Sequence, residues 1–79
     1  MIKDILAHYE EETFLVLDGF DKAIIGVDEK NMLLIYSVKK CLKILEKEMS
    51  NEDAIDYFYY NVVGSCVAEK SPILCFDNL

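Results

Sequence analysis

The residues that could carry acid–base or nucleophilic chemistry are few and lie far apart in the chain. The sole histidine, His8, precedes Tyr9 and a run of three glutamates, whose carboxylates could raise its pKa. A general base needs a second placed group, and none is recognisable around His8, so we expect a surface histidine. Cys66 or Cys75 would need an adjacent base to act as a nucleophile, and the histidine is distant in sequence. We therefore predict no catalytic residue, no cofactor and no enzymatic activity.

Carboxylates cluster in two stretches that invite a calcium-site interpretation: Asp18 with Asp21, and Asp28 with Glu29. An EF-hand requires acids or amides at alternate positions, then glycine, then glutamate at the twelfth position, and the spacing here does not follow that pattern. We predict solvated loop carboxylates and no metal site.

A run of aromatic residues, Tyr57-Phe58-Tyr59-Tyr60, is the most informative pattern in the chain. On a helix, four consecutive side chains span about 300°, so they cannot all face one core. Phe58 falls on the expected core face, which leaves Tyr57, Tyr59 and Tyr60 as candidates for a partner-binding surface, because exposed tyrosines are enriched in interfaces. The alternative is that further contacts bury them within the monomer.

The charge balance is acidic, with a net charge of −7 from fifteen acids and eight lysines, and no arginine occurs in the sequence. Arginine is the preferred side chain for gripping phosphate and reading guanine, so we do not expect nucleic-acid binding. Half of the lysines fall in one predicted helix, at Lys39, Lys40, Lys43 and Lys47. We interpret them as a solvated helix face, with an anion-binding patch as the weaker alternative.

Size and composition favour one small domain over residues 1–79, because a chain of this length has room for a single hydrophobic core. No apolar run is long enough to span a bilayer, and the first residues lack the features of a secretory signal. The three cysteines fit neither a disulfide framework nor a zinc motif. We predict a cytoplasmic protein with free thiols and no membrane contact.

Hydrophobic periodicity predicts both helices and strands. A short amphipathic helix is expected from Ile2 to Tyr9, and later helices near 38–49 and 51–66, capped by Ser37 and Ser50. Apolar, β-rich runs predict strands at 13–17, 22–27, 32–36 and 73–76, with residues 28–31 forming a hairpin loop and residues 69–72 a turn. We therefore predict an α+β fold: a small antiparallel sheet, made of the hairpin and the C-terminal strand, packed by two to three helices.

The segment from Asp18 to Phe76 resembles a family of small uncharacterised proteins of bacteria and phages. The matching stretches are Asp18–Asp21, Ala23–Val27, Tyr36–Cys41, Ala54–Phe58, Asn61–Gly64 and Glu69–Ile73, with a departure from the usual pattern at 66–68. The resemblance implies an α+β fold, a cytosolic setting and a mobile-element origin, and carries no assigned activity.

These observations lead to two functional hypotheses of different kinds. The first is a small, non-catalytic protein-interaction module whose partner is another protein or a second copy of the chain. The second is an acidic mimic of nucleic acid that occupies the binding groove of a host defence protein or another nucleic-acid-binding protein, which the net charge of −7 favours. An enzyme is the least favoured class.

Overall fold

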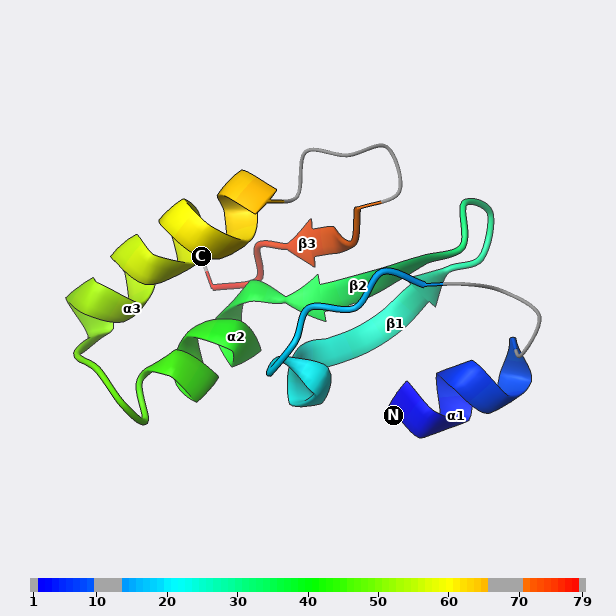
Figure 1. The fold of residues 1–79 in the computed structure, drawn as a ribbon, viewed down its shortest axis with the longest axis horizontal. Coiled ribbons are helices and arrows are strands. Elements are labelled where there is room, and N and C mark those ends of the chain that lie inside the picture. Colours follow the sequence, from blue (N-terminus) through cyan, green and yellow to red (C-terminus); the bar gives the residue numbers. More distant parts are fainter. Residues whose placement is uncertain (1, 10–13, 66–70, 79) are drawn as a thin grey trace.

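The fold is a three-stranded sheet with helices on one face and at one end, seen in a computed structural model that describes residues 2–9, 14–65 and 71–78 (Figure 1). The strands are β1 (Ile24–Asp28), β2 (Leu33–Ser37) and β3 (Ile73–Cys75). The α-helices are α1 (Ile2–His8), α2 (Val38–Leu45) and α3 (Asn51–Tyr57). The 3-10 helices are η1 (Asp21–Ala23) and η3 (Val63–Ser65), and a π-helical turn, η2 (Phe58–Val62), directly follows α3. The α+β class is as predicted.

The hairpin forms as the sequence predicts, with β1 and β2 antiparallel and Ile24 opposite Tyr36. The register shifts at a bulge between Ile24 and Gly26. Ile24 is buried while Ile25 is exposed, as expected for adjacent residues that point to opposite faces of a strand. In the loop, the Asp28 carboxylate accepts hydrogen bonds from the backbone amide of Lys30 and from the side chain of Asn31. These contacts are the reason that the polar tetrad turns the chain.

The third strand joins the sheet in the opposite sense to the prediction. β3 pairs with β2 in parallel, with Ile35 opposite Ile73, so the sheet is mixed and not wholly antiparallel. The reason lies in the connection: β2 runs straight into α2, and the chain crosses over through α2 and α3 before it enters β3. A helical crossover of this kind returns the chain to the starting end of the strand that it left.

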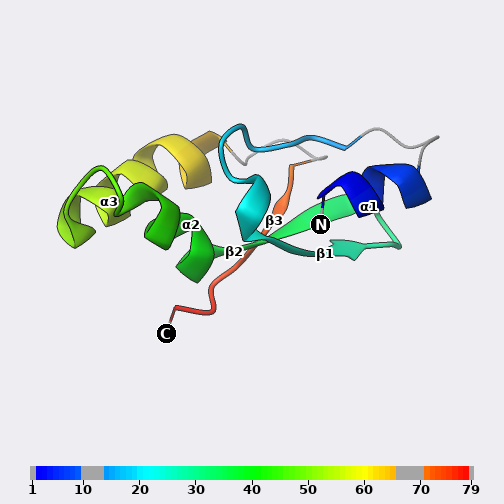
Figure 2. The ribbon, with the colours of Figure 1, turned by 90° about the horizontal axis from the view of Figure 1, so that it is seen from below.

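The predicted strand at 13–17 is wrong for the part that the structure describes, because residues 14–17 belong to no sheet. They run in extended form over the face of the sheet that α1 also covers (Figure 2). Within this segment the side chain of Phe14 is buried, whereas those of Leu15 and Val16 are exposed. The apolar composition therefore reflects one anchoring side chain and not a strand buried on both faces.

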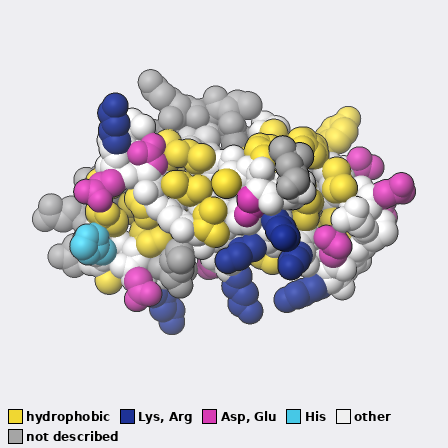
Figure 3. Space-filling view, turned by 180° about the vertical axis from the view of Figure 1, so that it is seen from behind, with side chains coloured by type: hydrophobic (Ala, Val, Ile, Leu, Met, Phe, Trp, Pro, Cys, Tyr) yellow, Lys and Arg dark blue, Asp and Glu magenta, His cyan; other side chains and the backbone are white. Residues whose placement is uncertain are grey.

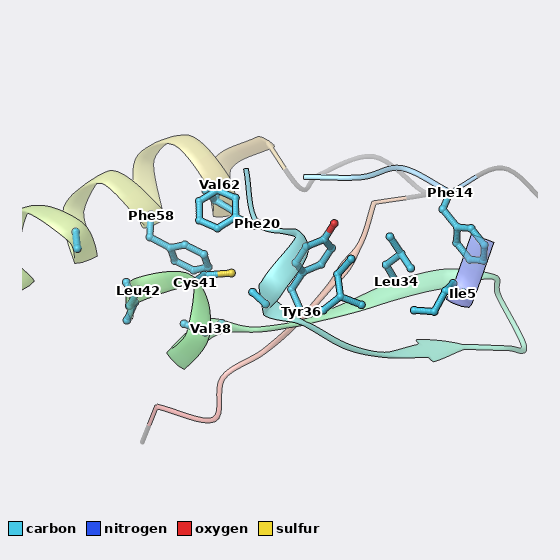
Figure 4. Close-up of a cluster of buried hydrophobic side chains, with 13 residues drawn as sticks. Ile5, Phe14, Phe20, Leu34, Tyr36, Val38, Cys41, Leu42, Phe58 and Val62 are labelled. Carbon is cyan, nitrogen blue, oxygen red and sulfur yellow. The ribbon is translucent and has the colours of Figure 1, made fainter. Parts of the chain in front are cut away.

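The hydrophobic core runs along this covered face of the sheet, from the helices α2 and α3 at one end to Ile5 and Phe14 at the other (Figure 4). Val38, Cys41 and Leu42 supply the face of α2, and Phe58 is fully buried at the end of α3. Both predicted caps are confirmed: the Ser37 hydroxyl accepts from the Lys40 amide at 3.1 Å, and that of Ser50 accepts from the Asp53 amide at 3.2 Å.

Several predicted boundaries move. α2 ends at Leu45, four residues before the predicted end, and the helical segment that starts with α3 continues through η2 and η3 to Ser65. Of the predicted apolar stripe of α1, Ile5 is buried as expected, whereas Leu6 is exposed. The predicted role of Cys66 on a helix face and residues 69 and 70 of the predicted turn fall outside the described residues. Within the described part, no helix is long and apolar enough to cross a membrane.

Candidate partner-binding surface

The structure places all three candidate tyrosines on the outside of the α3–η2 segment. Tyr57 is 44% exposed, Tyr59 49% and Tyr60 88%, while Phe58 between them is fully buried. Because the Phe58 side chain faces the core, its neighbours on the helix face sideways or outward, as the angular spacing of helical residues predicts. The alternative that these tyrosines are buried within the monomer is wrong. We call Tyr57, Tyr59 and Tyr60 the tyrosine surface.

The backbone beneath this surface is unusual, because the α-helix changes to a π-helical turn at Phe58. The Val63 amide donates to the Phe58 carbonyl, five residues back, and to the Tyr59 carbonyl, four residues back. Wide turns of this type are rare, and they occur frequently at functional sites. The π turn contains Tyr59 and Tyr60, so it sets the positions of two of the three exposed rings.

The C-terminal tail adds an aromatic residue that sequence reasoning missed. The rings of Tyr59 and Phe76 have centroids 6.2 Å apart at a tilt of 31°, and Phe76 is 41% exposed. The two residues are 17 positions apart in sequence and meet only because β3 lies beside β2. Phe76 therefore extends the tyrosine surface on its Tyr59 side.

A hydrogen-bonded clamp holds this tail in place. The buried hydroxyl of Ser37 donates to Asp77 Oδ2 at 2.6 Å, and the Lys39 amide donates to Asp77 Oδ1 at 3.0 Å. The bond from Ser37 lowers the pKa of the Asp77 carboxyl, and the Lys39 amide lowers it further. A carboxylate at the first turn of α2 also complements the helix dipole. Ser37 thus caps α2 and fixes the residue after Phe76 at the same time.

On the Tyr57 side, a cleft separates α3 and η2 from the segment 14–20. It has a volume of about 240 Å³, and we refer to it as the side cleft. Its lining residues are Val16, Leu17, Asp18, Phe20, Tyr57, Asn61 and Val62. Phe20 and Val62 lie together at this end of the core (Figure 4).

Two contacts shape the wall of the side cleft opposite α3. The Leu17 amide donates to the Tyr36 hydroxyl at 2.9 Å, and Figure 4 shows this hydroxyl pointing from the sheet toward the segment 14–20. The Phe20 amide then donates to the Leu17 carbonyl at 3.1 Å, which closes a four-residue turn. Gly19, the third residue of this turn, has φ +89°, a conformation that favours glycine. The turn places the exposed Asp18 carboxylate on the rim of the side cleft.

The helix that carries the tyrosines is acidic. Glu52, Asp53 and Asp56 are exposed on α3, and no lysine, arginine or histidine occurs between residues 48 and 65. Residues four positions apart share a helix face, so Asp53 lies on the side of Tyr57 and Asp56 on the side of Tyr60. The tyrosine surface is therefore aromatic and negatively charged.

Of the other chemical candidates from the sequence, the structure describes His8 and Cys75, while Cys66 falls outside the described residues. His8 is exposed on α1, where its ring lies edge-on to Tyr9, and neither His8 nor Cys75 lines the side cleft. Tyr9 donates to Glu29 at 3.0 Å, and this bond raises the pKa of the Tyr9 hydroxyl. The Cys41 side chain is buried, and that of Cys75 is half-buried.

The predicted loop carboxylates are also dispersed. The Asp28 carboxylate accepts a hydrogen bond from the Asn31 side chain within its own hairpin loop. This bond lowers the pKa of the Asp28 carboxyl. Asp21 lines a second cleft, of about 310 Å³, with Lys22 and Lys47. Among the described residues, no group of three or more histidine, cysteine or acidic side chains could hold a metal ion.

Two further surfaces are visible from behind the molecule, where hydrophobic side chains gather on the uncovered face of the sheet and lysines along one edge (Figure 3). Leu33, Ile35 and Ile73 are only half-buried on this face. The four lysines predicted as a solvated row, Lys39, Lys40, Lys43 and Lys47, are exposed. The three tyrosines are more exposed than these sheet residues, and their surface adjoins the side cleft, whose rim carries Asp18.

Comparisons of the chain with protein-family models, with curated proteins and with solved structures gave no match.

Proposed function

We propose that this protein is a small, non-catalytic protein-interaction module that binds its partner through Tyr57, Tyr59 and Tyr60. The observation that carries this proposal is the exposure of Tyr60, which is 88% accessible although it is a large aromatic side chain with exposed aromatic neighbours. Contiguous apolar surface of this kind typically marks an interface in a soluble protein. Tyrosine suits such a surface because its ring buries a large area and its hydroxyl keeps a hydrogen-bond partner.

The supporting structure is also of the type that an interface needs. Tyr59 and Tyr60 lie on a helical turn whose Phe58 is locked in the core, and the Ser37–Asp77 clamp holds the tail that bears Phe76. Side chains on a rigid frame lose little conformational freedom on binding, which favours affinity.

Affinity recovery from a lysate of the native host, with and without nuclease, tests the proposal. The bait is the wild-type protein or the Tyr59→Ala, Tyr60→Ala double variant. The control is Leu6→Ala, which truncates a similarly exposed side chain on α1, away from the tyrosine surface. We expect one protein to bind the wild type and the control but not the double variant. With the purified partner, truncation of a central aromatic anchor should weaken binding by at least about 30-fold, which corresponds to about 2 kcal/mol. Unchanged affinity in the double variant would refute the proposal.

The acidic-mimic hypothesis remains a second proposal because Glu52, Asp53 and Asp56 line one helix without a basic residue between them. It predicts that the partner is a nucleic-acid-binding protein, that the complex weakens steeply with added salt, and that DNA or RNA competes for the same site. A partner that binds nucleic acid and this protein at the same time would exclude it.

A further inference from the structure

The size of the side cleft indicates what kind of group it can receive. Its volume of about 240 Å³ is below the 300–1,000 Å³ that pockets for small-molecule ligands usually have. A cleft of this size suits one side chain of a partner protein. It also adjoins the tyrosine surface, since Tyr57 belongs to both.

The lining of the side cleft has two parts of different chemistry. Val16, Phe20 and Val62 give it apolar walls, and Asp18 and Asn61 add polar groups. The side-chain amide of Asn61 donates to the Tyr57 carbonyl at 3.1 Å, which orients its own carbonyl oxygen as an acceptor. Lysine and arginine combine an apolar stem with a cationic head, and they match a site with apolar walls and an acidic rim.

The charge around the side cleft disfavours an acidic or a purely apolar side chain as its occupant. Among the described residues, no lysine lines the side cleft, and the exposed carboxylates Asp18, Asp53 and Asp56 lie on its rim or on the adjoining helix. An acidic side chain would be repelled there, and a purely apolar one would shield the carboxylate of Asp18 from water without replacing its hydrogen bonds. A cation also gains from the ring of Tyr57, because aromatic faces attract lysine and arginine.

We infer that the side cleft is a socket for one lysine or arginine side chain of a separate partner protein, with Asp18 as its counter-charge and Tyr57 as its aromatic wall. This inference rests on the proposed function and names the chemistry of the partner. A partner other than a second copy is favoured because two chains of net charge −7 repel each other.

Selection of random dodecapeptides displayed on phage against the immobilised protein tests the inference. We expect the selected peptides to carry a lysine or arginine at one fixed position beside apolar residues. Replacing that residue with norleucine, which keeps the stem and removes the charge, should weaken binding of the synthetic peptide by about tenfold. Asp18→Asn should weaken binding of the basic peptide by up to about fivefold, the range for an exposed ion pair, and leave the norleucine peptide unchanged.

Asp21→Asn is the matched control, because it removes one exposed carboxylate three residues away that lines the other cleft. It should leave both affinities within about twofold. The socket would be overturned if the selected peptides lacked a basic residue or if no peptide were enriched. It would also be overturned if the basic peptide bound the wild type and Asp18→Asn equally. Peptides that fail to bind Tyr60→Ala but bind Asp18→Asn with wild-type affinity would overturn the socket and leave the proposed function intact. Self-association abolished by Asp18→Asn would make the occupant a second copy and overturn the separate partner.

Discussion

The hydroxyl of Tyr36 offers the sharpest test of how the fold builds the side cleft. Tyr36 is fully buried in the sheet, and its hydroxyl accepts a hydrogen bond from the Leu17 amide at 2.9 Å. Tyr36→Phe removes this acceptor and keeps the ring, so the core retains its shape. The change therefore removes the bond between the sheet and the wall of the side cleft.

The expected loss follows from that bond. A typical intramolecular hydrogen bond contributes about 0.5 to 1.5 kcal/mol, and a donor left without a partner in a buried place costs about 1 to 3 kcal/mol. Leu17 is half-buried, so water can replace part of the bond. We expect a decrease of about 1.5 kcal/mol in the free energy of unfolding, which lowers the Tm of a domain of this size by about 6 to 12 °C.

Urea unfolding followed by circular dichroism measures this loss, and amide hydrogen exchange of Leu17 reports on the bond itself. Tyr60→Phe is the control, because its side chain is exposed and its change should stay within about 0.5 kcal/mol. In Tyr36→Phe, the Leu17 amide should exchange faster, and the basic peptide selected for the side cleft should bind more weakly. Wild-type stability together with wild-type protection of the Leu17 amide would refute the reasoning.

The remaining predictions concern the clamp, the core and the thiols. Ser37→Ala should lower the free energy of unfolding by about 1 to 2 kcal/mol in urea titrations, because it removes the cap of α2 and the bond to Asp77. The lowered pKa of Asp77 means that its contribution to stability is complete above the ordinary value of 3.8 and is lost as the pH falls below it; Asp77→Asn should therefore flatten the acid side of the stability profile. Phe58→Ala should cost about 3 to 5 kcal/mol or prevent folding, as judged by circular dichroism. The Cys75 thiol should react with a thiol reagent before that of the fully buried Cys41, as resolved by mass spectrometry.

Among the correct predictions, the strongest depended on neighbours in the sequence. The hairpin followed from two apolar runs around a polar tetrad, and Ser37 and Ser50 were recognised as caps because a cap bonds an amide only three residues away. The outward position of Tyr60 followed from the angular spacing of residues on a helix. Each of these features is decided within one or two turns of chain.

The tertiary structure alone decided the features that join distant segments. β3 pairs in parallel because the crossover through α2 and α3 sets its direction, and no local pattern records that path. The segment 14–17 lies over the face of the sheet and not beside a strand, where the Tyr36 hydroxyl accepts from the Leu17 amide. The contact between Tyr59 and Phe76 and the side cleft likewise arise from residues far apart in sequence. Local spacing determines which side chain faces outward, but only packing determines what lies beside it.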